Sequence, residues 1–280
     1  MNCKKSIVIM LALLLSGLSS QVARAADPGH VTLGVGADYS SGKYGTAFET
    51  EIWDVPFSIG YAADRWSVRL TVPYINISGA NNVIPGVGPV LNLNPHGRGL
   101  GLGLGGGGGS GGTPTVTQGS ASGLGDVVAQ ATYGLVRDDA AQFGLDVTGK
   151  IKFGTADENK GLGTGKNDYG LNFDAYKGLG AWTLFGGAGY TRYGSSTYIP
   201  LHNGWNANVG AGYRLDPSNT IGAYYYYREK ISDSGYRQSE GTAYWNHKFS
   251  DSLRLQAYGL AGFTDGSPDW GAGANLRYSF

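Results

Sequence analysis

The sequence is poor in cysteine and in charge. Its 280 residues include a single cysteine, Cys3, and only 15% are charged. A disulfide framework, the usual support of small secreted domains, is therefore excluded. Basic and acidic residues number 21 each, so there is no basic excess of the kind that binds nucleic acid. Beyond residue 25, no apolar run reaches the roughly 20 residues that a transmembrane helix needs.

The N-terminus has the features of a signal peptide. Lys4 and Lys5 precede an apolar run over residues 6–18, and Ala23-Arg24-Ala25 places small residues where signal peptidase cleaves. That run is too short for a spanning anchor. We therefore expect residues 1–25 to be removed. The mature chain, residues 26–280, then lacks cysteine and has a net charge of −3, because the leader carries three basic residues and no acid.

Glycine and aromatic residues are abundant, with 49 glycines and 19 tyrosines. The aromatic and apolar residues recur at every second position rather than at helical spacing. In residues 53–61 each odd position is large and apolar or aromatic: Trp53, Val55, Phe57, Ile59 and Tyr61. Alternation of this kind predicts a strand with two different faces.

The same alternation returns along the whole mature chain and predicts twelve strands. Their expected spans are 31–41, 50–62, 66–78, 124–136, 142–153, 167–177, 181–193, 204–215, 220–228, 238–249, 253–263 and 270–280. Every second connection is a tight turn. The remaining connections are mostly longer, and the longest covers residues 79–123.

The fold class follows from strand number, strand length and the position of the aromatics. An even count of long strands, tight turns at one end, long loops at the other and aromatics at both ends of the apolar faces predict an all-β fold. We expect a transmembrane antiparallel up-and-down β-barrel of about 12 strands in the outer membrane of a Gram-negative bacterium. A soluble β-sandwich is the alternative with the same alternation.

This prediction also places the ends of the chain and its surroundings. Both termini lie in the periplasm, the 79–123 loop lies outside the cell, and the wall contacts outer-membrane lipid and lipopolysaccharide. Arg192 falls on the lipid side near the long loops, where a charge costs little. Outer-membrane barrels resemble this chain in ending on an aromatic residue, here Phe280. That resemblance implies recognition of Phe280 by the barrel-assembly machinery.

Residues 99–112, GLGLGLGGGGGSGG, match the glycine fingerprint of dinucleotide-binding folds. No helix follows them, and the predicted loop is extracellular, so we interpret the match as accidental. The tract is then either a flexible tether or a short ribbon whose three leucines enter the barrel mouth. The sequence leaves both alternatives open.

Four segments resemble the outer-membrane transporters named for the meta-cleavage pathway of phenol degradation. They are DVPFSIGYAADRWSVRLTVPYINISG, SGLGDVVAQATYGL, KFGTADENKGLGTGKNDYGLN and GAWTLFGGAGYTRYG. The most specific parts are Gly-Leu-Gly-Asp at 123–126 and Gly-Leu-Gly-Thr-Gly at 161–165. The resemblance covers about residues 54–280 and implies an outer-membrane channel for hydrophobic or aromatic compounds, similar to the fatty-acid-transporter barrels. The glycine tract departs from that pattern.

Signs of catalysis and metal binding are weak. Outer-membrane phospholipases resemble this architecture and pair a histidine with a serine two residues later, but none of the four histidines here has that serine. Residues 157–168 have the length of a calcium loop, yet Gly161 and Leu162 occupy positions for a ligand and for the turn glycine. We therefore predict no enzyme, no cofactor and no metal site.

The predicted lumen is the remaining candidate site, because its lining carries both signs of charge. We select Arg69, Asp126, Lys150, Asp168, Asp174, Arg214, Tyr224, Tyr226, Glu240 and Arg254. The charged residues form either a structural lattice of ion pairs or a selective path, and the two tyrosines offer stacking surface to an aromatic solute. The predicted function is passive uptake or efflux of small solutes. The alternative is a structural or adhesive barrel that acts through its extracellular loops.

Overall fold

In the computed structural model, the described residues are 29–94, 98 and 116–280. The predicted leader, residues 1–25, and the glycine tract, residues 99–112, lie outside them. Both alternatives for the tract therefore stay open. Among the described residues, no helix combines the length and the apolar character needed to cross a membrane.

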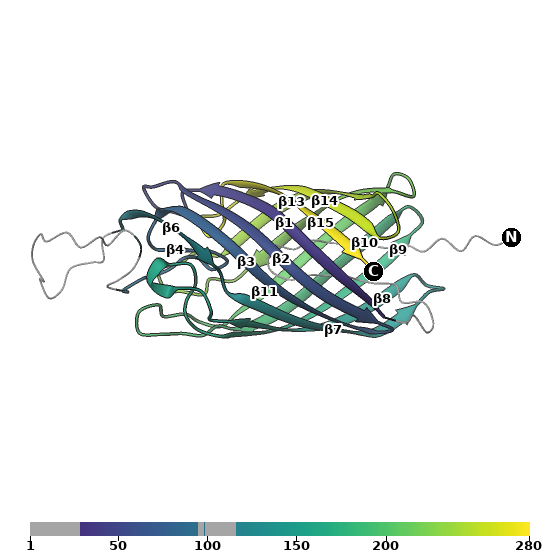
Figure 1. Ribbon diagram of the computed structural model, residues 1–280, viewed down its shortest axis with the longest axis horizontal. Helices are drawn as coiled ribbons and strands as arrows, with labels where there is room; N and C mark the ends of the chain where they lie inside the picture. The colour runs from purple at the N-terminus through teal and green to yellow at the C-terminus, as the bar shows by residue number, and fades with distance from the viewer. Residues whose placement is uncertain (1–28, 95–97, 99–115) are drawn as a thin grey trace, which may run out of the picture.

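The described chain forms a closed antiparallel barrel of twelve strands (Figure 1). Each wall strand pairs with its neighbours in the sequence, and the first pairs with the last, so that the sheet has no open edge. The wall consists of β1 (His30–Gly42), β2 (Thr50–Ala63), β3 (Trp66–Ala80), β6 (Gln118–Leu124) with β7 (Val127–Asp138), β8 (Phe143–Phe153), β9 (Asp168–Leu179), β10 (Trp182–Arg192), β11 (Gly204–Arg214), β12 (Asn219–Arg228), β13 (Gln238–Lys248), β14 (Leu253–Gly262) and β15 (Trp270–Ser279).

The two ends of the barrel differ, as predicted. The turn end carries the tight connections and the C-terminus, and the loop end carries the long connections (Figure 1). Asp64, in the turn between β2 and β3, has a φ of 48°, a left-handed conformation that short aspartate side chains tolerate. At the loop end lie two short strands outside the wall, β4 (Val83–Ile84) and β5 (Gly88–Pro89), and a 3-10 helix, Glu158–Lys160.

The predicted alternation is confirmed in the wall. Phe57 and Val209 are exposed on the outside, whereas the neighbouring Asn208 is buried in the lumen. Aromatic pairs gather at both ends of the outer surface. At the loop end they are Tyr39–Trp53, Tyr39–Trp270 and Tyr190–Trp205, and at the turn end Tyr61–Trp66 and Trp182–Tyr213. An apolar band between two aromatic girdles is the surface of a barrel that spans a bilayer.

The start of the fourth wall strand was predicted wrongly. We expected it at residue 124, but β6 already begins at Gln118, and Gly125 and Asp126 interrupt the strand before β7 continues it. Both pieces pair with β3, which itself continues to Ala80. Residues 118–123 are QGSASG, so no large apolar side chain marks the alternation there.

A bulge in β7 exchanges the lipid-facing and lumen-facing positions of its last residues. The β7–β8 register shifts between Gly134 and Val136, so that Leu135 and Val136 are both exposed outside. The next residue, Arg137, then points inward and forms an ion pair with Asp146. A Cβ atom at position 134 would lie 2.7 Å from the guanidinium carbon of Arg137, so a larger residue there would displace this side chain. Strict alternation would have placed Arg137 on the lipid side.

Candidate functional site

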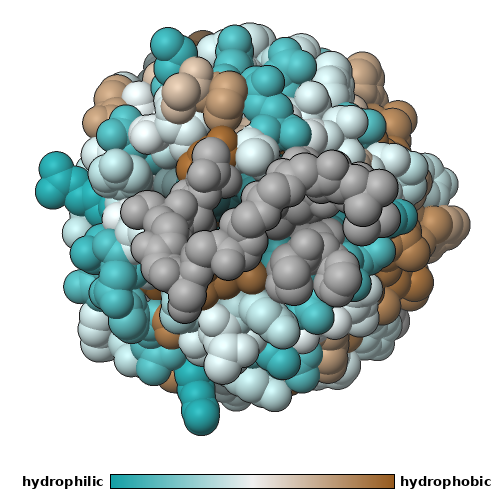
Figure 2. All heavy atoms as spheres, turned by 90° about the vertical axis from the view of Figure 1, so that its left-hand side faces the viewer, coloured by the Kyte–Doolittle hydropathy of each residue, from teal (hydrophilic) through white to brown (hydrophobic). Residues whose placement is uncertain are grey.

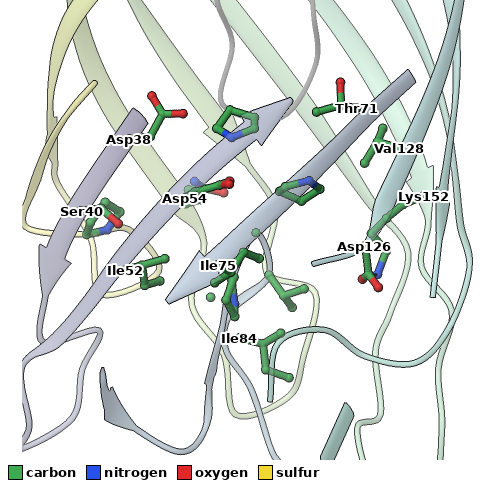
Figure 3. A pocket seen from close by; sticks show the side chains of 18 of the residues that line it. Asp38, Ser40, Ile52, Asp54, Thr71, Ile75, Ile84, Asp126, Val128 and Lys152 are labelled. Carbon is green, nitrogen blue, oxygen red and sulfur yellow. Dashed lines mark hydrogen bonds and ion pairs between the residues drawn. The ribbon is translucent and has the colours of Figure 1, made fainter. Parts of the chain in front are cut away.

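A cavity of about 330 Å³ occupies the lumen toward the loop end. Figure 3 shows Asp38 and Asp54 projecting into it from neighbouring strands, with Asp126 and Lys152 close together elsewhere on its wall. Acidic and basic residues are balanced in the lining. The acidic residues are Asp38, Asp54, Asp126, Asp168 and Glu240, and the basic residues are Arg69, Lys150, Lys152, Arg228 and Arg277.

The mouth of this cavity is narrowed by residues 81–94, here called the mouth loop. Ile84, Val87 and Val90 of the mouth loop form a buried cluster with apolar residues of two other loops, Ile199, Leu201 and Ile231. Figure 2 looks onto this end, where hydrophilic side chains predominate around the rim and hydrophobic ones gather toward one edge. The mouth loop therefore has its own small core inside the barrel entrance.

Two arginines hold the mouth loop by its backbone. Arg228, 3% exposed at the end of β12, donates from Nη2 to the carbonyl of Val87 at 2.6 Å and from Nη1 to that of Gly86 at 3.3 Å. Arg98 donates to the carbonyls of Ala80 and Val83. Burial lowers the pKa of Arg98 to about 10, so it stays protonated at neutral pH. Charged donors strengthen these hydrogen bonds.

A polar cluster lies where β7, β8 and β9 reach the loop end. We call Asp126, Lys152, Thr164 and Asp168 the motif junction. The Nζ atom of Lys152 lies 2.7 Å from Oδ2 of Asp126 and 3.2 Å from Oδ2 of Asp168, and it donates to Oγ1 of Thr164 at 3.2 Å. One ammonium group therefore joins two carboxylates and a loop hydroxyl.

The motif junction explains why two glycine-rich motifs, 123–126 and 161–165, occur in this chain. A Cβ atom at position 163 would lie 2.7 Å from Oδ2 of Asp126. One at position 123 would lie 3.0 Å from the side chain of Leu162. The two motifs thus pack directly on one another, and glycine permits the close approach.

Aromatic side chains fill part of the lumen between the loop end and the turn end. Phe185, Tyr224 and Tyr244 form a buried cluster, with Tyr176, Tyr226 and Tyr258 packed against it. The hydroxyl of Tyr258 donates to Oδ1 of Asp38 at 2.7 Å. Asp38 is in turn opposite Asp54 in the β1–β2 register.

A second cavity, of about 110 Å³, lies at the turn end. Its lining includes Arg214, Lys248, Arg254 and Arg277. Two residues of β15, Asn275 and Arg277, line both cavities. The cavities therefore adjoin at these two residues, beside the aromatic cluster.

The ten residues predicted from the sequence are distributed over the whole lumen. Arg69, Asp126, Lys150, Asp168, Tyr226 and Glu240 line the loop-end cavity. Arg214 and Arg254 line the turn-end cavity. Tyr224 belongs to the aromatic cluster, and Asp174 is buried and accepts a hydrogen bond from Asn208 at 3.5 Å. Alternation along each strand does not assign them to these separate groups.

Both alternatives for the lumen charges, a lattice of ion pairs and a selective path, stay open. The structure shows ion pairs of Lys152 with Asp126 and Asp168 and of Arg137 with Asp146 in the lumen. Sequence reasoning missed the mouth loop, Arg98 and Arg228 altogether. It also passed over Asp38 and Tyr258, although both occupy inward positions in alternating strands and were open to the same reasoning.

Several solved structures share this fold. An outer membrane channel from Pseudomonas putida F1 matches with a TM-score of 0.67 and 14% identity over 91% of this chain and 97% of that chain. The NanC porin matches with a TM-score of 0.49 and 11% identity over 89% of this chain and 98% of that chain. The CymD monoaromatic hydrocarbon channel matches with a TM-score of 0.42 and 12% identity over 89% of this chain and 88% of that chain. The last two scores are too low to support a functional argument.

No curated protein matches the sequence. The likeness to the Pseudomonas channel shows the fold of a Gram-negative outer-membrane barrel. A family model matches residues 42–280, which is most of the chain. The protein therefore belongs to the family described as "Putative MetA-pathway of phenol degradation".

Proposed function

We propose that this protein is an outer-membrane channel through which small solutes pass passively, in uptake or in efflux. The observation that carries the proposal is the pair of adjoining cavities, which together extend from the mouth loop to the turn end. Membership of the family supports the same function.

We further propose that the solutes include aromatic compounds. The family description refers to phenol degradation. Tyr226 and Tyr258 line the loop-end cavity, and Tyr244 lines the turn-end cavity. Their rings offer the faces and edges against which another aromatic ring packs.

Electrical recording separates the channel from the adhesive alternative. If the two cavities join into a path for ions, purified protein reconstituted in planar bilayers is expected to give discrete single-channel steps. The slower gel migration of the heated barrel serves as the control for folding. Folded protein that never conducts, and that binds to a host or matrix surface, would support the adhesive alternative and refute the channel.

We also propose the orientation: loop end outside the cell, termini in the periplasm, and residues 1–25 removed as a signal peptide. Arg192, exposed on the outer face near the loop end, would then reach lipopolysaccharide phosphates, and Phe280 would be recognised by the assembly machinery.

Protease accessibility tests this orientation. An epitope inserted at Asp233, exposed in the β12–β13 loop, is expected to be cleaved on intact cells. The same epitope at Asp139, in the β7–β8 turn, is expected to be cleaved only after the outer membrane is permeabilised. Cleavage at Asp139 but not at Asp233 in intact cells would reverse the topology.

A further inference from the structure

The charges of the lumen are distributed unevenly along its length. The loop-end cavity is lined by equal numbers of acidic and basic residues. The turn-end cavity differs, because no aspartate or glutamate occurs among the described residues that line it, while Arg214, His247, Lys248, Arg254 and Arg277 do. A solute that moves between the two ends therefore passes from a mixed into a basic environment.

Arg277 lies where the two cavities adjoin. Arg254 is directly opposite it in the β14–β15 register, and Arg69 on β3 lines the same loop-end cavity. No ion pair to any of these three arginines is found among the described residues, and Nη1 of Arg277 is buried without a hydrogen-bond partner. A buried charged donor that lacks a partner is costly, so the site favours an anion that supplies one.

The carboxylates of the lumen do not neutralise this cluster. In the β1–β15 register Arg277 is opposite Gly34, whereas Asp38 is opposite Gly273, four residues away. That separation corresponds to roughly 13 Å along the strand. On the opposite wall, Asp146 is paired with Arg137, and Asp174 accepts a hydrogen bond from Asn208. Neither of these two aspartates lines either cavity.

We propose that Arg69, Arg254 and Arg277 form an anion-selective constriction and that the transported solutes carry a carboxylate. This proposal rests on the channel function proposed above. Guanidinium groups stay charged at any physiological pH and bind a carboxylate through two parallel hydrogen bonds. Tyr244 and Tyr258 line the adjoining cavities, so the class that the site fits best is a small aromatic carboxylate.

Ion selectivity in planar bilayers tests the proposal. Under a KCl gradient, the zero-current potential of the parent channel is expected to indicate preference for chloride, because a basic lining concentrates anions by roughly tenfold or more. Arg277→Gln is expected to remove most of that preference. Arg277→Lys keeps the charge and is expected to retain it. Arg192→Gln removes an arginine from the outer surface and is expected to change nothing.

The chemistry of the solute is tested with benzoate and its neutral analogue benzamide in a liposome-swelling assay. Benzoate is expected to enter faster than benzamide through the parent, and the difference is expected to disappear in Arg277→Gln. Folded parent protein that conducts without anion preference, or an Arg277→Gln channel with the parent's selectivity, would overturn this proposal alone. Absence of any conductance would instead overturn the channel function on which it rests.

Discussion

Replacement of Arg228 by alanine is expected to raise the single-channel conductance several-fold. Arg228 joins β12 to the tip of the mouth loop through the carbonyls of Gly86 and Val87. Hydrogen bonds from a charged donor contribute about 1.5–3 kcal/mol. Without them the mouth loop loses its link to β12, and what holds its tip is the hydrogen bond from Arg98 to Val83 and the apolar contacts to Ile199, Leu201 and Ile231, so the loop is displaced from the entrance more easily. Planar-bilayer recording measures the change directly.

The matched control is Arg237→Ala, which removes an exposed arginine from the neighbouring loop and is expected to leave the conductance unchanged. Deletion of residues 83–89 removes the tip of the mouth loop itself and gives the upper limit of the effect. Parent conductance in both Arg228→Ala and the deletion would contradict a mouth loop that narrows the path.

The barrel itself was predictable because one simple pattern governs the side chains of its wall. Side chains alternate between lipid and lumen, and turns separate stretches of similar length, so eleven of the twelve wall strands could be placed without knowledge of any contact. The exception is β6, where residues 118–123 are small or polar and leave the alternation without a signal. The bulge at Gly134 was not predicted for a related reason. One extra residue moves every later side chain of the strand to the opposite side of the wall.

The interior was predictable as a set of residues but not as a set of contacts. Alternation identified inward positions such as Arg69 and Glu240, yet it carries no information on which of them meet across the lumen. Tyr258 and Asp38 are 220 positions apart in the sequence and hydrogen-bond only because the barrel closes between β1 and β15. Contacts of this kind depend on closure and tilt, which no local pattern encodes.

The packing of the mouth loop could not be predicted from the sequence, for a different reason. Val83, Ile84, Val87 and Val90 have neither helical nor alternating spacing, and the long connection around them offered no hint of a core. The structure shows that Ile84, Val87 and Val90 pack on apolar residues of two distant loops, whereas Val83 packs on Tyr44 and Ala80. Sequence reasoning did consider an inward-folding loop, but it looked for one in the glycine tract, residues 99–112, which lies outside the described residues.

The two glycine-rich motifs that carried the family resemblance acquire a physical meaning at the motif junction. Gly163 leaves room for the carboxylate of Asp126, and Thr164 and Asp126 both contact the ammonium group of Lys152. The second oxygen of Asp126 accepts the backbone N–H of Ala156 at 2.9 Å. The motifs therefore fix the β8–β9 loop against the interruption of the fourth wall strand. This places Lys152 at the centre of the loop-end structure.

Lys152→Met is accordingly expected to lower the free energy of unfolding by about 3 kcal/mol, because removal of one partner leaves buried carboxylates without a counter-charge. The side chains concerned are largely buried: Lys152 is 15% exposed, Asp126 10% and Asp168 6%. Urea titration of the barrel in lipid vesicles, followed by tryptophan fluorescence, measures the loss. The control Lys248→Met breaks a pair whose partner, Asp251, is 97% exposed, and is expected to have no measurable effect.

A rescue variant distinguishes charge from packing in this result. If the loss comes from uncompensated carboxylates, the additional changes Asp126→Asn and Asp168→Asn in the Lys152→Met background are expected to restore much of the lost stability. The amide oxygens still accept the backbone N–H groups of Ala156 and Gly194. Equal unfolding midpoints for the parent and Lys152→Met would show that the motif junction is held by the glycine packing alone. In that event the close approach of Gly163 to Asp126, rather than the ammonium group between the carboxylates, would be what the two motifs preserve.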